Sequence, residues 1–127
     1  MRQKYLAAAV VALLAAAPRA YSQAPVIETV QNAASNVAVT SVAPQVLISI
    51  KGQNLAAYTE AATGLPLPRT LGGATVSFNG GPYGGSIAPL LYASPTQIDA
   101  QVPSDIEGTA IAVTVATAKG ARELILI

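Results

Sequence analysis

The chain has 127 residues, of which 52% are hydrophobic and only 10% are charged, and its formal net charge is +1. It has no cysteine and no histidine, which excludes disulfides, thiol chemistry, cysteine or histidine metal ligands and a Ser-His-Asp triad. The few basic residues are scattered, so no nucleic-acid surface is expected, and the length fits one domain.

Residues 1–22 have the three parts of a secretory signal peptide. Arg2 and Lys4 give a basic start, residues 6–17 form an unbroken apolar run, and Ala20 and Ser22 provide small residues before a cleavage site. As a helix the run would reach about 18 Å, too short for roughly 30 Å of hydrocarbon. We expect cleavage after Ser22, which would leave residues 23–127 as a secreted or cell-surface domain without a membrane span. Loss of Arg2, Lys4 and Arg19 would leave four basic and six acidic residues, a formal charge of −2.

Beyond residue 22, short runs of Val, Ile, Leu and Ala alternate with polar residues and are separated by Gly, Pro, Asn and Ser. This period of two is typical of strands with one buried side. The pattern predicts an all-β, two-layer antiparallel sandwich of about seven strands. The expected strands are 26–30, 45–51, 74–78, 86–92, 97–102, 109–116 and 122–127.

Residues 52–72 are expected to form a long connection between the two sheets. One helical turn is possible over 56–64, and Pro66 and Pro68 then force an extended path. Lys119-Gly120 marks the last hairpin. The glycine-rich stretch 80–85 predicts a wide, mobile loop rather than a tight turn.

The chain contains several short motifs in this order: Asn32-Ala33-Ala34-Ser35, Val42-Ala43-Pro44, Ile48 to Leu55, Pro66-Leu67-Pro68, Leu71-Gly72-Gly73, Ala88 to Pro95 and Gln97 to Pro103. Their order and spacing resembles a family of C-terminal domains on secreted proteins of Solibacter-type acidobacteria. A strand that ends in Gly-x-Asn-Leu is also similar to the IPT/TIG group of immunoglobulin-like domains. The resemblance implies an immunoglobulin-like sandwich at or outside the cell surface, with no enzyme activity and no cofactor.

The chain departs from this family in a few places. Gln45 stands where Gly is common, so the turn there is expected to differ, and Asp99 stands where Asn is commoner. The loop 80–85 looks longer than usual. Many relatives have a second, similar half, so the chain is expected to be either a minimal stand-alone form or a truncated copy of a larger surface domain.

Gln97, Asp99 and Gln101 share one face of the strand 97–102, opposite Ile98 and Val102. Any half-exposed strand shows this alternation, but the same face could dock a neighbouring domain or a glycan. Tyr83, at the tip of the glycine-rich loop, is the aromatic expected to be most exposed and would complete a carbohydrate-binding surface. By contrast, Phe78 and Tyr92 lie on strands and are expected in the core or at its rim.

The carboxylates allow two further hypotheses. Asp105 and Glu107 could hold calcium, although two carboxylates are fewer ligands than a strong site uses; the alternative is a solvated turn that ends at Gly108. Asp99 with Glu60 or Glu28 could act as a glycosidase pair, but nothing in the sequence places two of them opposite each other.

The apolar terminal run, residues 122–127, could pair with a partner chain by strand addition, or aggregate if left uncovered. Taken together, the sequence predicts a secreted, non-catalytic structural or adhesion module whose partner is a protein or glycan at the cell surface. The alternatives are a carbohydrate-binding module and a truncated copy of a two-half domain.

Overall fold

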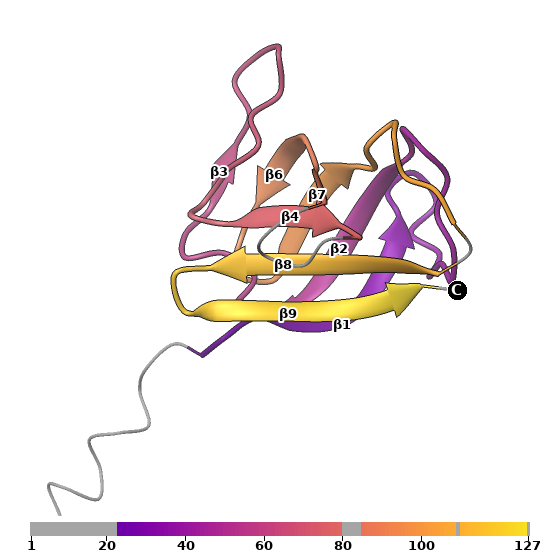
Figure 1. Ribbon diagram of the computed structural model, residues 1–127. Coiled ribbons are helices and arrows are strands. Elements are labelled where there is room, and N and C mark those ends of the chain that lie inside the picture. Colours follow the sequence, from indigo (N-terminus) through magenta and orange to yellow (C-terminus); the bar gives the residue numbers. More distant parts are fainter. Residues whose placement is uncertain (1–22, 80–84, 109, 127) are drawn as a thin grey trace, which may run out of the picture.

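The computed structural model describes residues 23–79, 85–108 and 110–126. Within these ranges there is no helix, and nine strands form two antiparallel sheets stacked face to face (Figure 1). One sheet has the order β1-β2-β7-β6-β3 and the other the order β5-β4-β8-β9. The strands are β1 (Val26–Asn32), β2 (Leu47–Gln53), β3 (Glu60–Ala61), β4 (Thr75–Phe78), β5 (Ser86–Ile87), β6 (Leu90–Ala93), β7 (Gln97–Gln101), β8 (Ile111–Thr117) and β9 (Gly120–Leu126).

The strand order is that of an immunoglobulin-like sandwich. In such domains strands A, B, E and D share one sheet, and C, F and G form the other. Here β1, β2, β7 and β6 occupy the first set of positions, β4, β8 and β9 occupy the second, and β5 lies beside β4. The predicted all-β, immunoglobulin-like sandwich is therefore confirmed, with nine strands in the described residues instead of about seven.

The prediction of one strand over 86–92 is wrong, because this segment contributes to both sheets. β5 pairs with β4, and β6 pairs with β7 in the opposite layer. Pro89 has no N–H to donate, so a ladder cannot continue through it. On either side of it, Ala88 N donates to Val76 O (2.8 Å) and Leu90 N donates to Pro68 O (2.7 Å). The chain crosses between the sheets at this point.

Residues 52–72 form more than a connection. β3 adds a fifth strand beside β6, and no helical turn occurs over 56–64. Glu60 is held in place because its Oε1 accepts a hydrogen bond from Gly72 N (2.9 Å). After β3, residues 62–70 extend beyond the sheets as a projecting loop (Figure 1), whose Leu65 is 87% exposed.

The core lies between the inner faces of the two sheets, as the period-two pattern predicts. The side chains that face inward from the central strands are fully buried or nearly so, which places them out of contact with water. No cross-link supports this core, because the sequence has no cysteine. These side chains are Ile48 and Ile50 of β2, Ile98 and Ala100 of β7, Val76 and Phe78 of β4, Val113 and Val115 of β8, and Val102 after β7.

The Gly-x-Asn-Leu motif at the end of β2 has a physical reason at each position. A Cβ on Gly52 would lie 1.9 Å from Val26 O, because β1 bulges and approaches closely there. Asn54 has a positive φ of 56°, which Asn tolerates better than most residues. Leu55 is completely buried. The motif therefore fixes where β2 ends and where the chain enters the core.

Candidate functional site

The predicted polar stripe lies on the outer face of the five-stranded sheet. β7 is the middle strand of this sheet, between β2 and β6. The register places Ser49 of β2 opposite Asp99, and Lys51 opposite Gln97. Residues directly opposite each other in an antiparallel pair point to the same face. We call Ser49, Lys51, Gln97 and Asp99 the polar face.

Hydrogen bonds join the four side chains of the polar face into one chain. Asp99 Oδ1 accepts from Ser49 Oγ (2.7 Å) and from Gln97 Nε2 (2.8 Å), and Gln97 Oε1 accepts from Lys51 Nζ. Although Ser49 points away from the core, only 3% of it is exposed. The four groups therefore hold one another in fixed positions.

Gln101, the third predicted member of the stripe, is not part of this chain of bonds. Its Nε2 donates to Gln45 O (3.3 Å), in the connection between β1 and β2. In the ladder with β2 it lies opposite Leu47, which is exposed. The structure thus brings Gln97 and Asp99 together and turns Gln101 towards the end of the sandwich.

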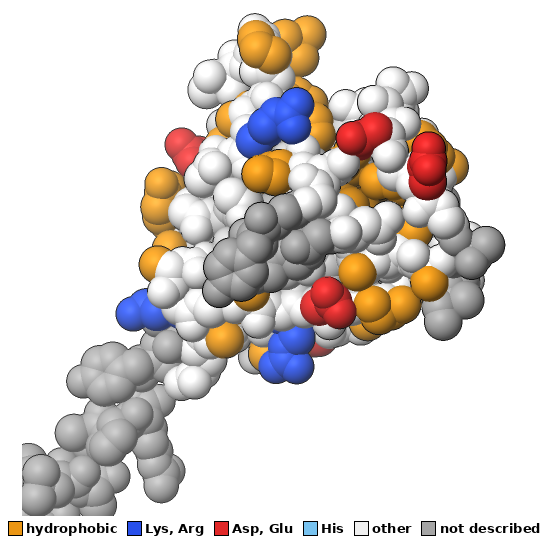
Figure 2. All heavy atoms as spheres, viewed as in Figure 1, with side chains coloured by type: hydrophobic (Ala, Val, Ile, Leu, Met, Phe, Trp, Pro, Cys, Tyr) orange, Lys and Arg blue, Asp and Glu red, His pale blue; other side chains and the backbone are white. Residues whose placement is uncertain are grey.

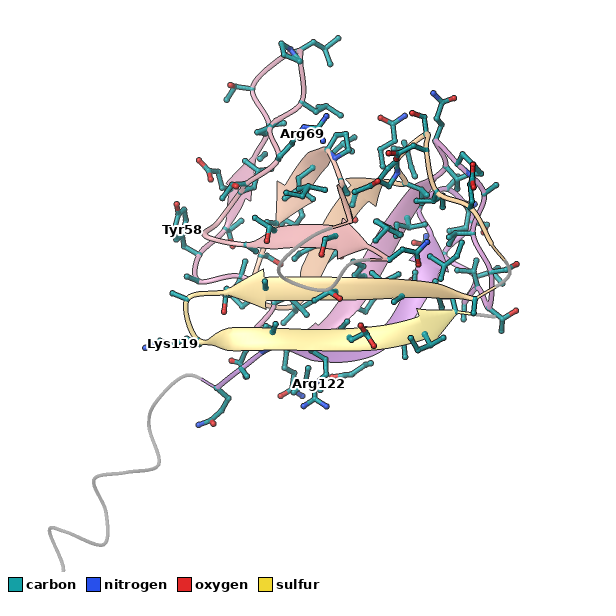
Figure 3. The ribbon with its side chains drawn as sticks, in the orientation of Figure 1. Tyr58, Arg69, Lys119 and Arg122 are labelled. Atoms are coloured by element: carbon teal, nitrogen blue, oxygen red, sulfur yellow. The ribbon has the colours of Figure 1, made fainter. Side chains whose placement is uncertain are left out.

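The aromatic residues divide between core and surface. Phe78 is completely buried, and Tyr92 is half-buried on β6, opposite Asp99, so Tyr92 lies at the rim. Tyr83, proposed as an exposed platform, lies outside the described residues. Tyr58 is 56% exposed and extends from the side of the molecule where β3 begins (Figure 3).

Asp105 and Glu107 have separate contacts. Asp105 Oδ1 accepts from Ser86 Oγ (2.7 Å), whereas the main-chain oxygen of Glu107 accepts from Asn79 Nδ2 (3.4 Å). In the part of the chain that the structure describes, no group of three or more metal-binding side chains comes together. A calcium ion here would therefore depend on main-chain oxygens and water for most of its ligands.

The proposed carboxylate pairs are not brought together. Glu60 lies opposite Ala93, which faces the core, so it leaves the sheet on the side opposite Asp99. Glu28 Oε1 accepts from Gln53 Nε2 (3.3 Å) on β2. β1 is two strands from β7, or about 10 Å. A glycosidase directs both carboxylates at one bond, whereas Glu60 and Glu28 accept hydrogen bonds from Gly72 and Gln53.

The strand β9, predicted as a pairing edge, is the outer strand of its sheet and lies beside β1 (Figure 1). Its Ile125 is 48% exposed. Arg122 points from β9 towards the N-terminal segment (Figure 3), where its Nε donates to Pro25 O (3.3 Å). The face in Figure 2 shows basic and acidic side chains dispersed among apolar and neutral ones, without a strongly charged patch.

The alternation of polar and apolar residues predicts which side chains of each strand point outward. It does not predict which outward side chains of neighbouring strands lie next to each other. It places Ser49 and Lys51 on the outer side of β2, yet only the pairing of β2 with β7 brings them to Gln97 and Asp99. Arg69, which lies at the foot of the projecting loop (Figure 3), has no local signal that marks it as functional.

No family model, no curated protein and no solved structure matches the chain. Among the described residues, no helix is long and apolar enough to cross a membrane. The arguments about function therefore depend on the side-chain arrangement described above.

Proposed function

We propose that the chain is a secreted, non-catalytic structural or adhesion module whose polar face meets a partner at the cell surface. The observation that carries this proposal is the bonded set of Ser49, Asp99, Gln97 and Lys51 in the middle of an open sheet. Side chains that are already held in position lose little conformational freedom when a partner binds, which favours a specific contact.

The contacts of the carboxylates support a non-catalytic role. Asp99 Oδ1 already accepts two hydrogen bonds, and Glu60 and Glu28 are bonded to Gly72 and Gln53. The polar groups thus act as a fixed surface rather than as an acid and a base.

We also propose that the chain is a member of the Solibacter-type family of secreted domains, within the IPT/TIG group. The support comes from the motif positions. Gly52, Asn54 and Leu55 each meet a requirement of the fold. Gln45, where relatives commonly have Gly, has a positive φ of 67°, which is the conformation that Gly adopts without strain.

Export is tested by sequencing the N-terminus of the protein recovered from outside the cytoplasm. We expect the mature chain to begin at Gln23, and we expect Ala20→Asp, three residues before the cut, to block cleavage. An uncleaved wild-type chain that stays in the cytoplasm would overturn the proposal of secretion.

The non-catalytic role is tested by a broad screen for hydrolase activity. We expect no turnover from the wild-type protein. Turnover that disappears in Asp99→Asn and persists in the matched variant Glu28→Gln would contradict the proposal, because it would assign chemistry to the polar face.

Carbohydrate binding by the same face is the second candidate function. One observation favours it: the half-buried Tyr92 lies opposite Asp99 in the sheet, so an aromatic residue and a carboxylate share the outer face. Glycan-array binding that is lost in Tyr92→Ala or Tyr83→Ala would support this candidate, and no signal across a broad array would remove it.

A further inference from the structure

A cleft of about 560 Å³ opens at one end of the sandwich. Four separate parts of the chain line it: Gln45 before β2, Arg69 from the projecting loop, residues 85–87 with Pro89 around β5, and residues 101–105 from the end of β7 onward. Its volume lies within the roughly 300–1,000 Å³ that small-molecule sites occupy. Connections that converge at the end of a sandwich are a common place for binding.

A second hollow, of about 620 Å³, adjoins this cleft below the projecting loop. The two hollows share Arg69, Pro89 and Gln101. A ligand that extended from one hollow into the other would therefore lie beside all three residues, including the cation of Arg69. This arrangement fits an elongated ligand better than a compact one.

Arg69 has unused hydrogen-bonding capacity in this position. Its Nη1 donates to Ile87 O (2.7 Å), which anchors the side chain to β5. A guanidinium group has five N–H donors, and the others bond to none of the described residues. An anchored arginine with free donors is well suited to bind a carboxylate through two parallel hydrogen bonds.

The rest of the lining suits the hydroxyl groups and ring faces of a sugar. Gln101 donates one hydrogen bond to Gln45 O and keeps its amide oxygen. Asp105 accepts from Ser86 through one oxygen and keeps the other as an acceptor. Pro89 and Pro103 supply apolar surface between these polar groups.

A peptide strand fits this place less well. Addition of a strand needs open main-chain groups along a sheet edge. At β5, the edge strand that borders the cleft, Arg69 already occupies the oxygen of Ile87. We therefore propose that the cleft binds an acidic saccharide of the uronic acid type, with a carboxylate on Arg69 and hydroxyl groups on Gln101 and Asp105.

This proposal is independent of the partner for the polar face, because none of the four residues of that face lines the cleft. The test is a titration of the isotope-labelled protein, followed by amide chemical shifts, with a galacturonic acid trimer. The fully methyl-esterified trimer is the matched neutral ligand, because it keeps the rings and loses the charge. We expect shifts centred on Arg69, Gln101 and Asp105, and affinity for the acid at least about tenfold higher than for the ester.

Protein variants test the same contact. Arg69→Gln is expected to weaken binding of the acid about tenfold or more, and Arg69→Lys to retain part of the affinity, because it keeps the charge without the planar fork. Arg122→Gln on β9 removes the same charge far along the chain and is expected to bind as the wild-type protein does. Unchanged amide shifts outside the cleft would show that the Arg69 variants are folded.

Several results would overturn the proposal. Equal affinity for the acid and the ester would remove the carboxylate contact, and so would full affinity in Arg69→Gln. Shifts confined to Gln97 and Asp99 would assign the sugar to the polar face instead. Tighter binding of an acidic peptide than of the trimer at the cleft would assign the site to a peptide, and no shift with any of these ligands would end the proposal.

Discussion

At the scale of single residues, main-chain geometry determines which residue types fit at a few positions where side-chain packing does not decide. A Cβ on Gly52 would lie 1.9 Å from Val26 O of β1. Gln45 and Asn54 adopt positive φ values of 67° and 56°. Only Gly adopts such a backbone at no steric cost, and Asn tolerates it better than Gln. Gln45 is thus a locally unfavourable residue in an otherwise consistent sequence.

Replacement of Gly52 by Ala is expected to destabilise the fold, because the new Cβ would meet Val26 O at 1.9 Å and push β1 away. Such overpacking lowers the free energy of unfolding by about 1–3 kcal/mol. Gly64→Ala is the control, since nothing lies within 4 Å of its Cβ position. Urea denaturation of both variants checks this; equal midpoints would show that β1 does not approach Gly52 closely.

Gln45→Gly is expected to stabilise the protein. It removes a left-handed strain of about 1–2 kcal/mol and adds an entropy cost in the unfolded chain of about 0.5–1 kcal/mol. The net gain is about 0.5–1 kcal/mol, measurable as a higher thermal midpoint. Gln45→Ala keeps the strain and should show no such gain, so a rise in both variants would indicate a cause other than the backbone angle.

At the scale of strands, the pairing of β2 with β7 brings polar side chains from both strands together on one face of the sheet. Ser49 is almost completely buried beneath its neighbours on the polar face, and its hydroxyl group depends on Asp99 for an acceptor. A buried polar group that loses its partner destabilises a protein more than the hydrogen bond itself stabilises it. The two residues should therefore be energetically coupled.

Asp99→Ala is expected to lower the free energy of unfolding by about 1–3 kcal/mol, because it leaves the Ser49 hydroxyl group without an acceptor. In the Ser49→Ala background the same change should have a smaller effect, which a double-mutant cycle by chemical denaturation measures. Additive effects would mean that the two side chains do not interact in solution.

The local pattern predicts six of the strands, since β1, β2, β4, β7, β8 and β9 each overlap an expected range. It does not separate β5 from β6, because an apolar run has the same pattern whichever sheet it joins. β3 is two residues long and has no detectable period. Arg69 and Asp105 line one cleft only because four separate parts of the chain converge there. The residues near each of them in the sequence do not indicate that the two lie at the same site.

At the scale of the whole molecule, both sheets depend on the same core. Phe78 of β4 is completely buried among side chains from both layers, and no disulfide holds either sheet on its own. A shared core without cross-links should unfold in one cooperative transition, as small single domains usually do. The two sheets therefore should not melt separately.

Phe78→Leu tests this dependence. The smaller side chain leaves a cavity between the sheets and should lower the free energy of unfolding by roughly 1–2 kcal/mol. Because the core is common to both layers, the variant should still show one transition when urea unfolding is followed by circular dichroism and by tyrosine fluorescence. The measurement is made on the mature chain in a Tyr83→Phe background, which leaves Tyr58, before β3, and Tyr92, on β6, as its tyrosines. Their fluorescence then reports on the five-stranded sheet. A fluorescence midpoint that stayed at the wild-type value while the circular dichroism midpoint fell would contradict this expectation. The five-stranded sheet would then be stable without the core contact of Phe78, and the two sheets would not share one core.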